Sequence, residues 1–302
     1  MKRYEIHLPS SDGETNLHGY RWEPEGEARF VVQLVHGMQE HIARYDAFAT
    51  FLTEQGIAVV GHDHLGHGQS VTSEDKLGYF SDENGHVCVL RDMHRMTGYA
   101  KLHYPGKPVI MLAHSMGSFF ARRYVTAYPD ELDGLILSGT GQMPYALVRM
   151  GYVTAKSIAA GKGELFSSRL LDRMAFGTYG PLERWLCRNR PVVEKYKADP
   201  LCGFLFTAGG FRDFFRVLMD LAKEKDFSKL RKDLPVLFIA GMLDPVGSKS
   251  KGVLAAYNQL VALGLTDVDI YLYKDDAHEV LNERDKGDVY LDVLRWLEAR
   301  FS

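Results

Sequence analysis

Short apolar runs alternate along the chain with segments whose apolar residues recur every three or four positions. The runs are FVVQLVHGM (30–38), IAVVGHDH (57–64), KPVIMLAHS (107–115) and LDGLILSG (132–139). Between the first two runs, Tyr45, Phe48 and Leu52 lie at helical spacing. A strand that is covered by helices on both faces contacts apolar side chains on each side. This alternation therefore predicts an α/β fold with a mostly parallel sheet.

The two ends of the chain add to this core. The opening segment, residues 2–24, contains two extended stretches around the dipeptide Asp12-Gly13, which favours a turn, so we expect an N-terminal hairpin. The alternation resumes near the C-terminus with apolar strands in 234–246 and 267–280 and an amphipathic helix in 287–301.

Residues 140–232 interrupt the alternation. They contain no comparable apolar strand, but helix-like segments that are rich in Met, Phe and Leu and are broken by Gly and Pro. Phe211, Phe215 and Leu218 can share one helical face. We therefore expect a helical cap at 140–232, inserted into one core domain that is formed by residues 1–139 and 233–302.

Composition and charge narrow the class of protein. The 302 residues are 46% hydrophobic, which is enough for a sizeable core, and 36 Lys and Arg face 39 Asp and Glu, for a net charge of −3. Such a balance does not favour a nucleic-acid partner. No apolar run follows the first residues or is long enough to span a bilayer, so neither a signal peptide nor a transmembrane segment is expected.

Cysteine usage indicates the compartment. Cys88, Cys187 and Cys202 form an odd, scattered set without CxxC spacing, which argues against a disulfide framework and against a thiolate zinc site. We expect buried, inert thiols in a soluble, cytoplasmic protein.

The segment LAHSMGS (112–118) follows an apolar strand and precedes a helix, which is the setting of a nucleophile elbow. In this sharp turn the residues two before and two after the nucleophile must be small. Ala113 and Gly117 are small, although glycine is the usual residue at the first of these positions. The sequence thus predicts Ser115 as a nucleophile.

A serine nucleophile needs a base, and the base needs an acid that orients it. In this fold the three follow each other along the chain as Ser, Asp or Glu, and His. Asp244 and His278 each follow a predicted strand and are expected to complete a catalytic triad with Ser115. Asp275, Asp276 and Glu279, which flank the histidine, are expected to be solvated loop charges.

An oxyanion hole requires two backbone N–H groups that point at the reacting oxygen. One is expected from Met116, directly after the serine. The other is expected from Met38, in the HGMQEH loop (36–41) that follows the first apolar strand.

Several spaced motifs together resemble those of a known superfamily. They are HGxxEHxxRY at 36–45, HDxxGHGxS at 62–70, the elbow at 112–118, GxxD at 241–244, HExxNE at 278–283 and the cap stretch at 199–214. With them the chain resembles the α/β-hydrolase superfamily, and within it bacterial monoacylglycerol lipases and lysophospholipase-type serine hydrolases. The resemblance spans nearly the whole chain.

The resemblance implies hydrolysis of single-chain acyl esters through an acyl-enzyme, without a cofactor. It also implies that cap residues such as Phe204, Phe211 and Phe215 line an acyl tunnel above Ser115, and that the enzyme makes transient contact with lipid aggregates. Thioesterases, peptidases and acyltransferases use the same triad, and a non-catalytic binding protein with this fold is a further alternative.

The histidine-rich segment GHDHLGHGQS (61–70) raises the alternative of a metal-dependent hydrolase that uses His62, His64 and His67. Gly66 stands where the H-x-H-x-D-H metal motif of another hydrolase fold has its aspartate. In the resembling hydrolases this loop braces the floor of the active site. The three histidines are therefore expected to be hydrogen-bonded structural residues, with no metal bound.

Overall fold

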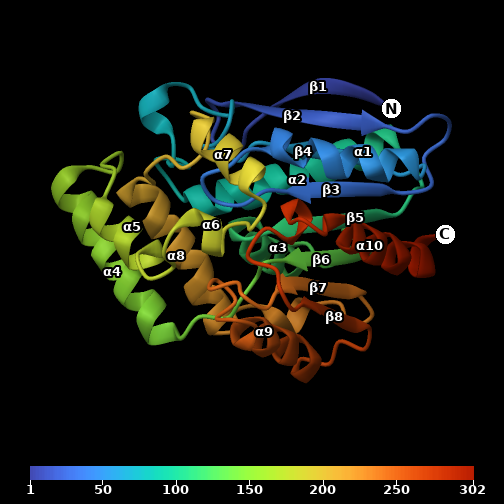
Figure 1. The fold of residues 1–302 in the computed structure, drawn as a ribbon. Helices are drawn as coiled ribbons and strands as arrows, with labels where there is room; N and C mark the ends of the chain where they lie inside the picture. The colour runs from blue at the N-terminus through green and yellow to red at the C-terminus, as the bar shows by residue number, and fades with distance from the viewer.

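An eight-stranded sheet runs through the molecule in the computed structural model, which describes residues 1–302 (Figure 1). The strand order is β1-β2-β4-β3-β5-β6-β7-β8. The strands are β1 (Lys2–Pro9), β2 (Asn16–Glu23), β3 (Val31–Val35), β4 (Ala58–His62), β5 (Val109–His114), β6 (Gly134–Ser138), β7 (Val236–Gly241) and β8 (Val268–Tyr273). β1 and β2 form the predicted hairpin, β2 pairs antiparallel with β4, and all other pairings are parallel. The predicted fold class is confirmed.

Helices cover both faces of the sheet. α1 (Asp46–Glu54) and α10 (Lys286–Phe301) pack on one face, and α2 (Gly85–His103), α3 (Met116–Ala127) and α9 (Lys251–Ala262) pack on the other. Short 3₁₀ helices are η1 (Ile42–Tyr45), η2 (Glu74–Lys76), η3 (Phe227–Lys229) and η4 (Val280–Asn282). None of the helices combines the length and the apolar composition that crossing a bilayer requires.

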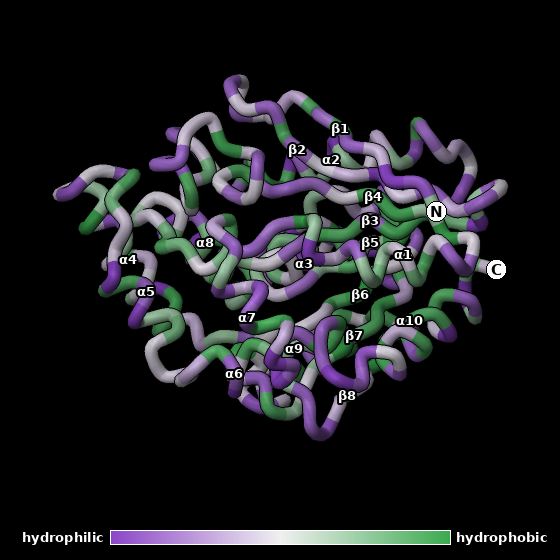
Figure 2. Tube along the Cα trace, turned by 45° about the horizontal axis from the view of Figure 1, so that its top comes forward, coloured by the Kyte–Doolittle hydropathy of each residue, from purple (hydrophilic) through white to green (hydrophobic).

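The central strands consist mainly of apolar residues, as Figure 2 shows along β3, β5, β6 and β7. In β3, Val32 and Leu34 belong to the core under α1 and α10, whereas Val31 and Val35 belong to the core under α2 and α3. Successive side chains of a strand point to opposite faces, so a strand between two helical layers is apolar at nearly every position. This explains the apolar runs of the sequence. The buried exception in β3, Gln33, donates a hydrogen bond of 3.0 Å to the carbonyl oxygen of Met93.

The chain forms a group of helices after β6 and before β7. They lie at the end of the sheet opposite the two chain ends (Figure 1). They are α4 (Tyr145–Lys162), α5 (Arg169–Phe176), α6 (Leu182–Trp185), α7 (Arg190–Ala198) and α8 (Ala208–Ala222). No strand of the sheet comes from this segment. We call these helices the cap; the division of the chain at residues 140 and 232 stays a prediction.

Candidate active site

Ser115 occupies the turn between β5 and α3. Its backbone has φ 50° and ψ −122°, a conformation that residues other than glycine rarely adopt and that stores strain at functional sites. A Cβ atom on Gly117 would lie 2.5 Å from the carbonyl oxygen of His36, so only glycine fits there. The turn presents Ser115, partly exposed, at the carboxyl end of the parallel sheet.

His278 and Asp244 lie beside this serine. Nε2 of His278 is 2.8 Å from Oγ of Ser115, and its Nδ1 is 2.9 Å from Oδ2 of Asp244. Asp244 is fully buried, and its Oδ1 accepts a hydrogen bond of 2.8 Å from the amide of Val246. The structure thus brings together three residues that follow three different strands, in the linear arrangement that proton transfer from serine to histidine requires.

The electrostatics of the site suit a histidine base. Burial acts to lower the pKa of His278, but the carboxylate of Asp244 outweighs it, so the pKa is raised above the ordinary value. The ring of His114 lies 4.6 Å from that of His278, and burial together with the charge of His278 lowers its pKa to about 3. Of these two rings, His278 is therefore the stronger base.

Met38 and Met116 carry the two backbone amides that are expected to form an oxyanion hole. The N–H of Met38 finds no acceptor within the protein, and Met116 is the first residue of α3, where an N–H has no intrahelical partner. The loop before Met38 is held by Glu40, whose Oε1 accepts a hydrogen bond of 2.6 Å from the Gly37 amide. Met38, Ser115 and Met116 line the same pocket.

A buried ion-pair network, which the sequence reasoning missed, supports this loop. Arg44 donates hydrogen bonds of 2.6 and 2.7 Å to Glu279 and one of 2.6 Å to Glu40. The expectation that Glu279 is a solvated charge is wrong: it is 4% exposed, because Arg44 supplies its counter-charge inside the fold. The ion pair joins the HGxxEHxxRY motif to the HExxNE motif. The presence of both motifs in one chain was the sequence signal from which this ion pair could have been predicted.

Asp275 and Asp276 differ in their exposure to solvent. Asp275 is exposed, as expected, whereas Asp276 is 2% exposed, so its description as a solvated charge is wrong. Burial, with the neighbouring carboxylates Asp285 and Glu283, raises the pKa of Asp276 to about 7. Neither residue is hydrogen-bonded to His278, whose Nδ1 contacts Asp244.

The three histidines of the segment 61–70 are buried, but their rings are not all hydrogen-bonded as expected. The ring nitrogens of His62 and His64 have no hydrogen-bond partner, and in His67 only Nδ1 has one, at 3.0 Å from the carbonyl oxygen of Leu65. The rings pack against one another and against aromatic rings such as that of Phe120. Burial lowers the pKa of His62 and of His67 to about 4, so both are neutral at pH 7. Their ring nitrogens do not converge on a common metal position.

A pocket of about 360 Å³ lies between Ser115 and the cap. Its wall is mostly apolar, and it contains Phe211 and Phe215, as expected from the sequence. Phe204 is not part of this wall: its ring instead packs against His67 at 5.4 Å and Phe206 at 6.3 Å, because it precedes α8 and points toward the loop after β4. The other apolar residues of the wall are Met38, Met116, Phe119, Met143, Leu147, Val148, Met174, Ala175, Phe176, Tyr179, Phe214, Leu218, Pro245 and Val246.

The sheet order, the cap and the strained serine beside a histidine and a buried aspartate define an α/β-hydrolase fold and a serine hydrolase. Over residues 26–285 the sequence matches the Hydrolase_4 family, described as serine aminopeptidase, S33. The chain belongs to this family.

Known proteins resemble the chain over nearly its full length. Human monoglyceride lipase is 27% identical over 298 residues, covering 97% of this chain and 90% of that protein. Monoacylglycerol lipase of Mycolicibacterium smegmatis is 29% identical over 282 residues, with 91% and 90% covered. The crystal structure of a thermostable carboxyl esterase from Bacillus coagulans, in complex with glycerol, superimposes with a TM-score of 0.89 at 26% identity and covers 100% of both chains.

Proposed function

We propose that this serine hydrolase cleaves monoacylglycerols, lysophospholipids or similar single-chain acyl esters through an acyl-enzyme. The observation that carries the proposal is the opening of an apolar pocket directly onto Ser115, whose Oγ lies 2.8 Å from His278. The monoglyceride and monoacylglycerol lipases that resemble the chain support the choice of substrate.

In the proposed mechanism Ser115 attacks the ester carbonyl while Nε2 of His278 takes the hydroxyl proton. Asp244 holds the ring by its Nδ1–H and stabilises the imidazolium that forms. The N–H groups of Met38 and Met116 donate to the oxyanion, and His278 then protonates the leaving alcohol. Water, activated by the same histidine, hydrolyses the acyl-enzyme.

Two hollows of very different size meet at Ser115. The apolar pocket accommodates the acyl chain under the cap. A second recess at Ser115, lined by Gln39, Glu40 and His114 among others, measures only about 20 Å³, which is room for about one water molecule.

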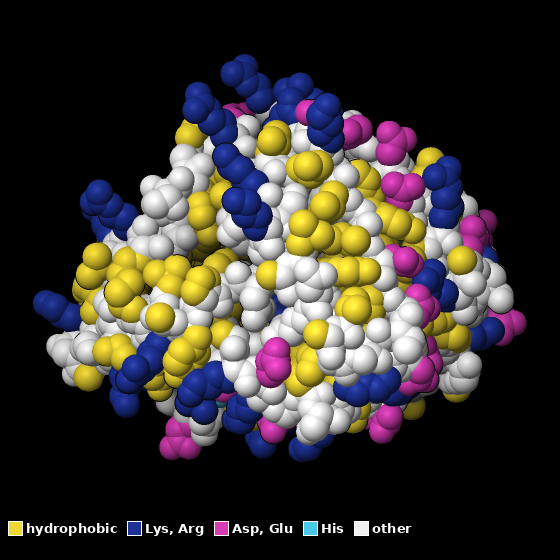
Figure 3. Space-filling view, turned by 90° about the horizontal axis from the view of Figure 1, so that it is seen from below, with side chains coloured by type: hydrophobic (Ala, Val, Ile, Leu, Met, Phe, Trp, Pro, Cys, Tyr) yellow, Lys and Arg dark blue, Asp and Glu magenta, His cyan; other side chains and the backbone are white.

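The cap offers a surface for transient contact with lipid aggregates. Large apolar side chains are exposed on α4 and α5, and Figure 3 shows hydrophobic side chains gathered on the cap side of the molecule, with Lys and Arg among them. Apolar patches of this kind commonly mark contact sites. The exposed residues are Leu147, Met150, Val153, Leu170 and Met174.

We place the enzyme in a reducing, cytoplasmic setting. This inference rests on Cys88, Cys187 and Cys202, which are all unpaired and buried thiols.

We expect kcat/KM to rise with pH through a single ionisation whose midpoint lies above 6.5. The imidazolium form of His278 cannot accept the serine proton, and Asp244 raises the pKa of that ring above 6.5. The measurement is the pH profile for a soluble ester, with and without a chelator. The chelator should leave the profile unchanged; an enzyme that it inactivates and that zinc restores would instead be a metal-dependent hydrolase.

We expect longer acyl chains to be better substrates until the pocket is full. Each buried methylene contributes about 0.8 kcal/mol, or roughly fourfold in kcat/KM, so two added carbons should give roughly fifteenfold. The measurement uses esters of graded length below their micelle concentrations.

Two cap variants test whether the pocket causes this preference. Phe215→Ala widens the pocket wall and should shift the optimal length, whereas Phe204→Ala, a matched, partly buried phenylalanine outside the wall, should not. If the shortest esters are best in both variants and in the parent, the single-chain lipid assignment is wrong, although the serine-hydrolase mechanism stands.

A further inference from the structure

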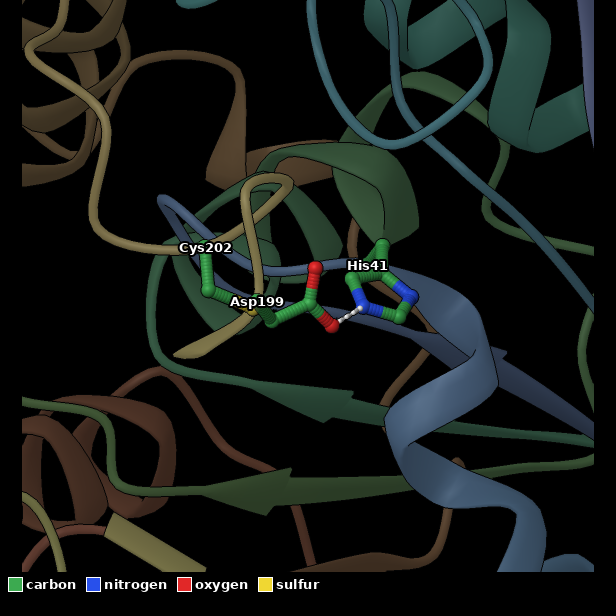
Figure 4. A group of neighbouring side chains, drawn as sticks. All are labelled: His41, Asp199 and Cys202. Atoms are coloured by element: carbon green, nitrogen blue, oxygen red, sulfur yellow. Dashed lines mark hydrogen bonds and ion pairs between the residues drawn. The ribbon is translucent and has the colours of Figure 1, made fainter. Parts of the chain in front are cut away.

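A second cluster of reactive side chains lies where the loop after β3 meets the cap. It consists of His41, Asp199 and Cys202, each of which offers one ligand atom within 4.8 Å of the other two. Nε2 of His41 is 2.8 Å from Oδ2 of Asp199 (Figure 4). An imidazole, a carboxylate and a thiolate are the three donor types that protein zinc sites use.

The backbone around this cluster is held in place independently of any ligand. The Gly203 amide donates a hydrogen bond of 3.0 Å to the carbonyl oxygen of Gln39, and Nε2 of Gln39 donates one of 2.7 Å to the carbonyl oxygen of Phe204. Oδ1 of Asp199 accepts one of 2.9 Å from the Leu201 amide, which leaves Oδ2 directed at His41. The two segments that supply the ligands are thus preorganised, which lowers the entropic cost of binding.

The cluster is accessible to an ion from solvent. The side chain of His41 is 13% exposed and that of Asp199 is 32% exposed, whereas Cys202 lies deeper, at 9%. An ion bound to these three groups can therefore keep a water molecule as a fourth ligand, which completes tetrahedral coordination.

The local charge also suits a cation. Arg44 is the nearby positive group, but it is bonded to two carboxylates, those of Glu40 and Glu279. With Asp199, three carboxylates surround this one guanidinium. The net charge of these four groups is −2 when His41 is neutral. A divalent ion would offset it.

We propose that His41, Asp199 and Cys202 bind a thiophilic divalent cation, Zn²⁺ above all, with water as the fourth ligand. On binding, the Cys202 thiol releases its proton to solvent, and the proton that Nε2 of His41 donates to Asp199 is replaced by the ion, with the neutral ring then carrying its proton on Nδ1. The ion adds a link between the cap and a loop that protein hydrogen bonds already hold, so its removal should leave kcat/KM unchanged. It takes no part in ester hydrolysis, so the site is separate from the proposed catalytic function.

Affinity at this site depends on pH. Because the thiolate is the ligand, zinc binding must strengthen as pH rises.

The test is a Co²⁺ titration of the metal-free enzyme, read by the thiolate-to-cobalt charge-transfer band, followed by displacement with Zn²⁺ in a calorimeter. We expect one ion per chain and tighter binding at higher pH. Cys202→Ser should abolish the band, and Asp199→Asn should weaken Zn²⁺ affinity at least tenfold. Cys88→Ser, which changes another buried cysteine outside the cluster, should bind as the parent does.

Labelling Ser115 with a fluorophosphonate before the titration separates this site from the triad, because an ion held by His278 would be displaced by the label. Ion binding that is retained after labelling supports the site at His41, Asp199 and Cys202. A band that persists in Cys202→Ser, binding that is lost on labelling, or the absence of saturable binding overturns the proposal. If Cys202→Ser does not fold, as judged by circular dichroism, Asp199→Asn and His41→Gln carry the test, and unchanged affinity in both overturns it.

Discussion

Ser115→Ala is expected to lose nearly all turnover, on the order of 10⁴–10⁶ in kcat, while the protein stays folded. The serine hydroxyl supplies the nucleophile, and its removal leaves only binding and the oxyanion-hole amides. Alanine adopts the strained φ of 50° at this turn at a cost similar to that of serine, so the stability should change little. The measurement is kcat and KM for a soluble ester, with the thermal midpoint of unfolding as the folding control.

A matched control is Ser118→Ala, which removes a serine hydroxyl one helical turn further along α3. Ser118 is fully buried and its Oγ donates to the carbonyl oxygen of Ser115, so this change should cost some stability but little chemistry. Parent enzyme should be labelled by a fluorophosphonate, and Ser115→Ala should not. Parent protein that resists the label and hydrolyses no ester would be a non-catalytic binding protein with this fold.

Asp244→Asn is expected to lower kcat by about 10⁴. The amide can present its NH₂ group to His278, which favours the tautomer that cannot accept the serine proton, and it provides no charge to stabilise the imidazolium. The pH midpoint of kcat/KM should also fall, because the carboxylate that raises the pKa of His278 is gone while burial still lowers it. A change that only perturbed the structure would not move the midpoint in this direction.

Asp275→Asn is the control for this prediction, since it neutralises an exposed carboxylate three residues before the histidine. Its kcat and its pH midpoint should stay close to the parent values. The opposite ranking of the two variants would mean that a different acid orients His278.

The fold was largely predictable because strands that are buried on two sides are apolar at nearly every position. The runs that became β3, β4, β5 and β6 stand out for that reason, and their regular separation by helical segments requires a parallel sheet. The edge strand β8 is only partly buried, so its sequence mixes polar and apolar residues, and its signal is weaker.

The order of candidate site residues along the chain was also readable from sequence. In a parallel sheet the strands all end at the same edge, so residues that follow them meet there. Position along the chain thus nominated Ser115, Asp244 and His278, and the structure places them within hydrogen-bonding distance. The loop that carries Met38 was expected at the same edge of the sheet, because it directly follows β3.

For other side chains, only the tertiary structure decided whether they are buried and what they contact. Glu279 is buried against Arg44, although the two are separated by 235 positions, and Phe204 lies outside the pocket that Phe211 lines. The cluster of His41 and Cys202 likewise joins a core loop to the cap. Local pattern determines strands and turns because these depend on neighbours in sequence. Whether a side chain is buried, which charge it pairs with and where it points depend on residues that are distant in sequence. These residues meet only in the folded chain.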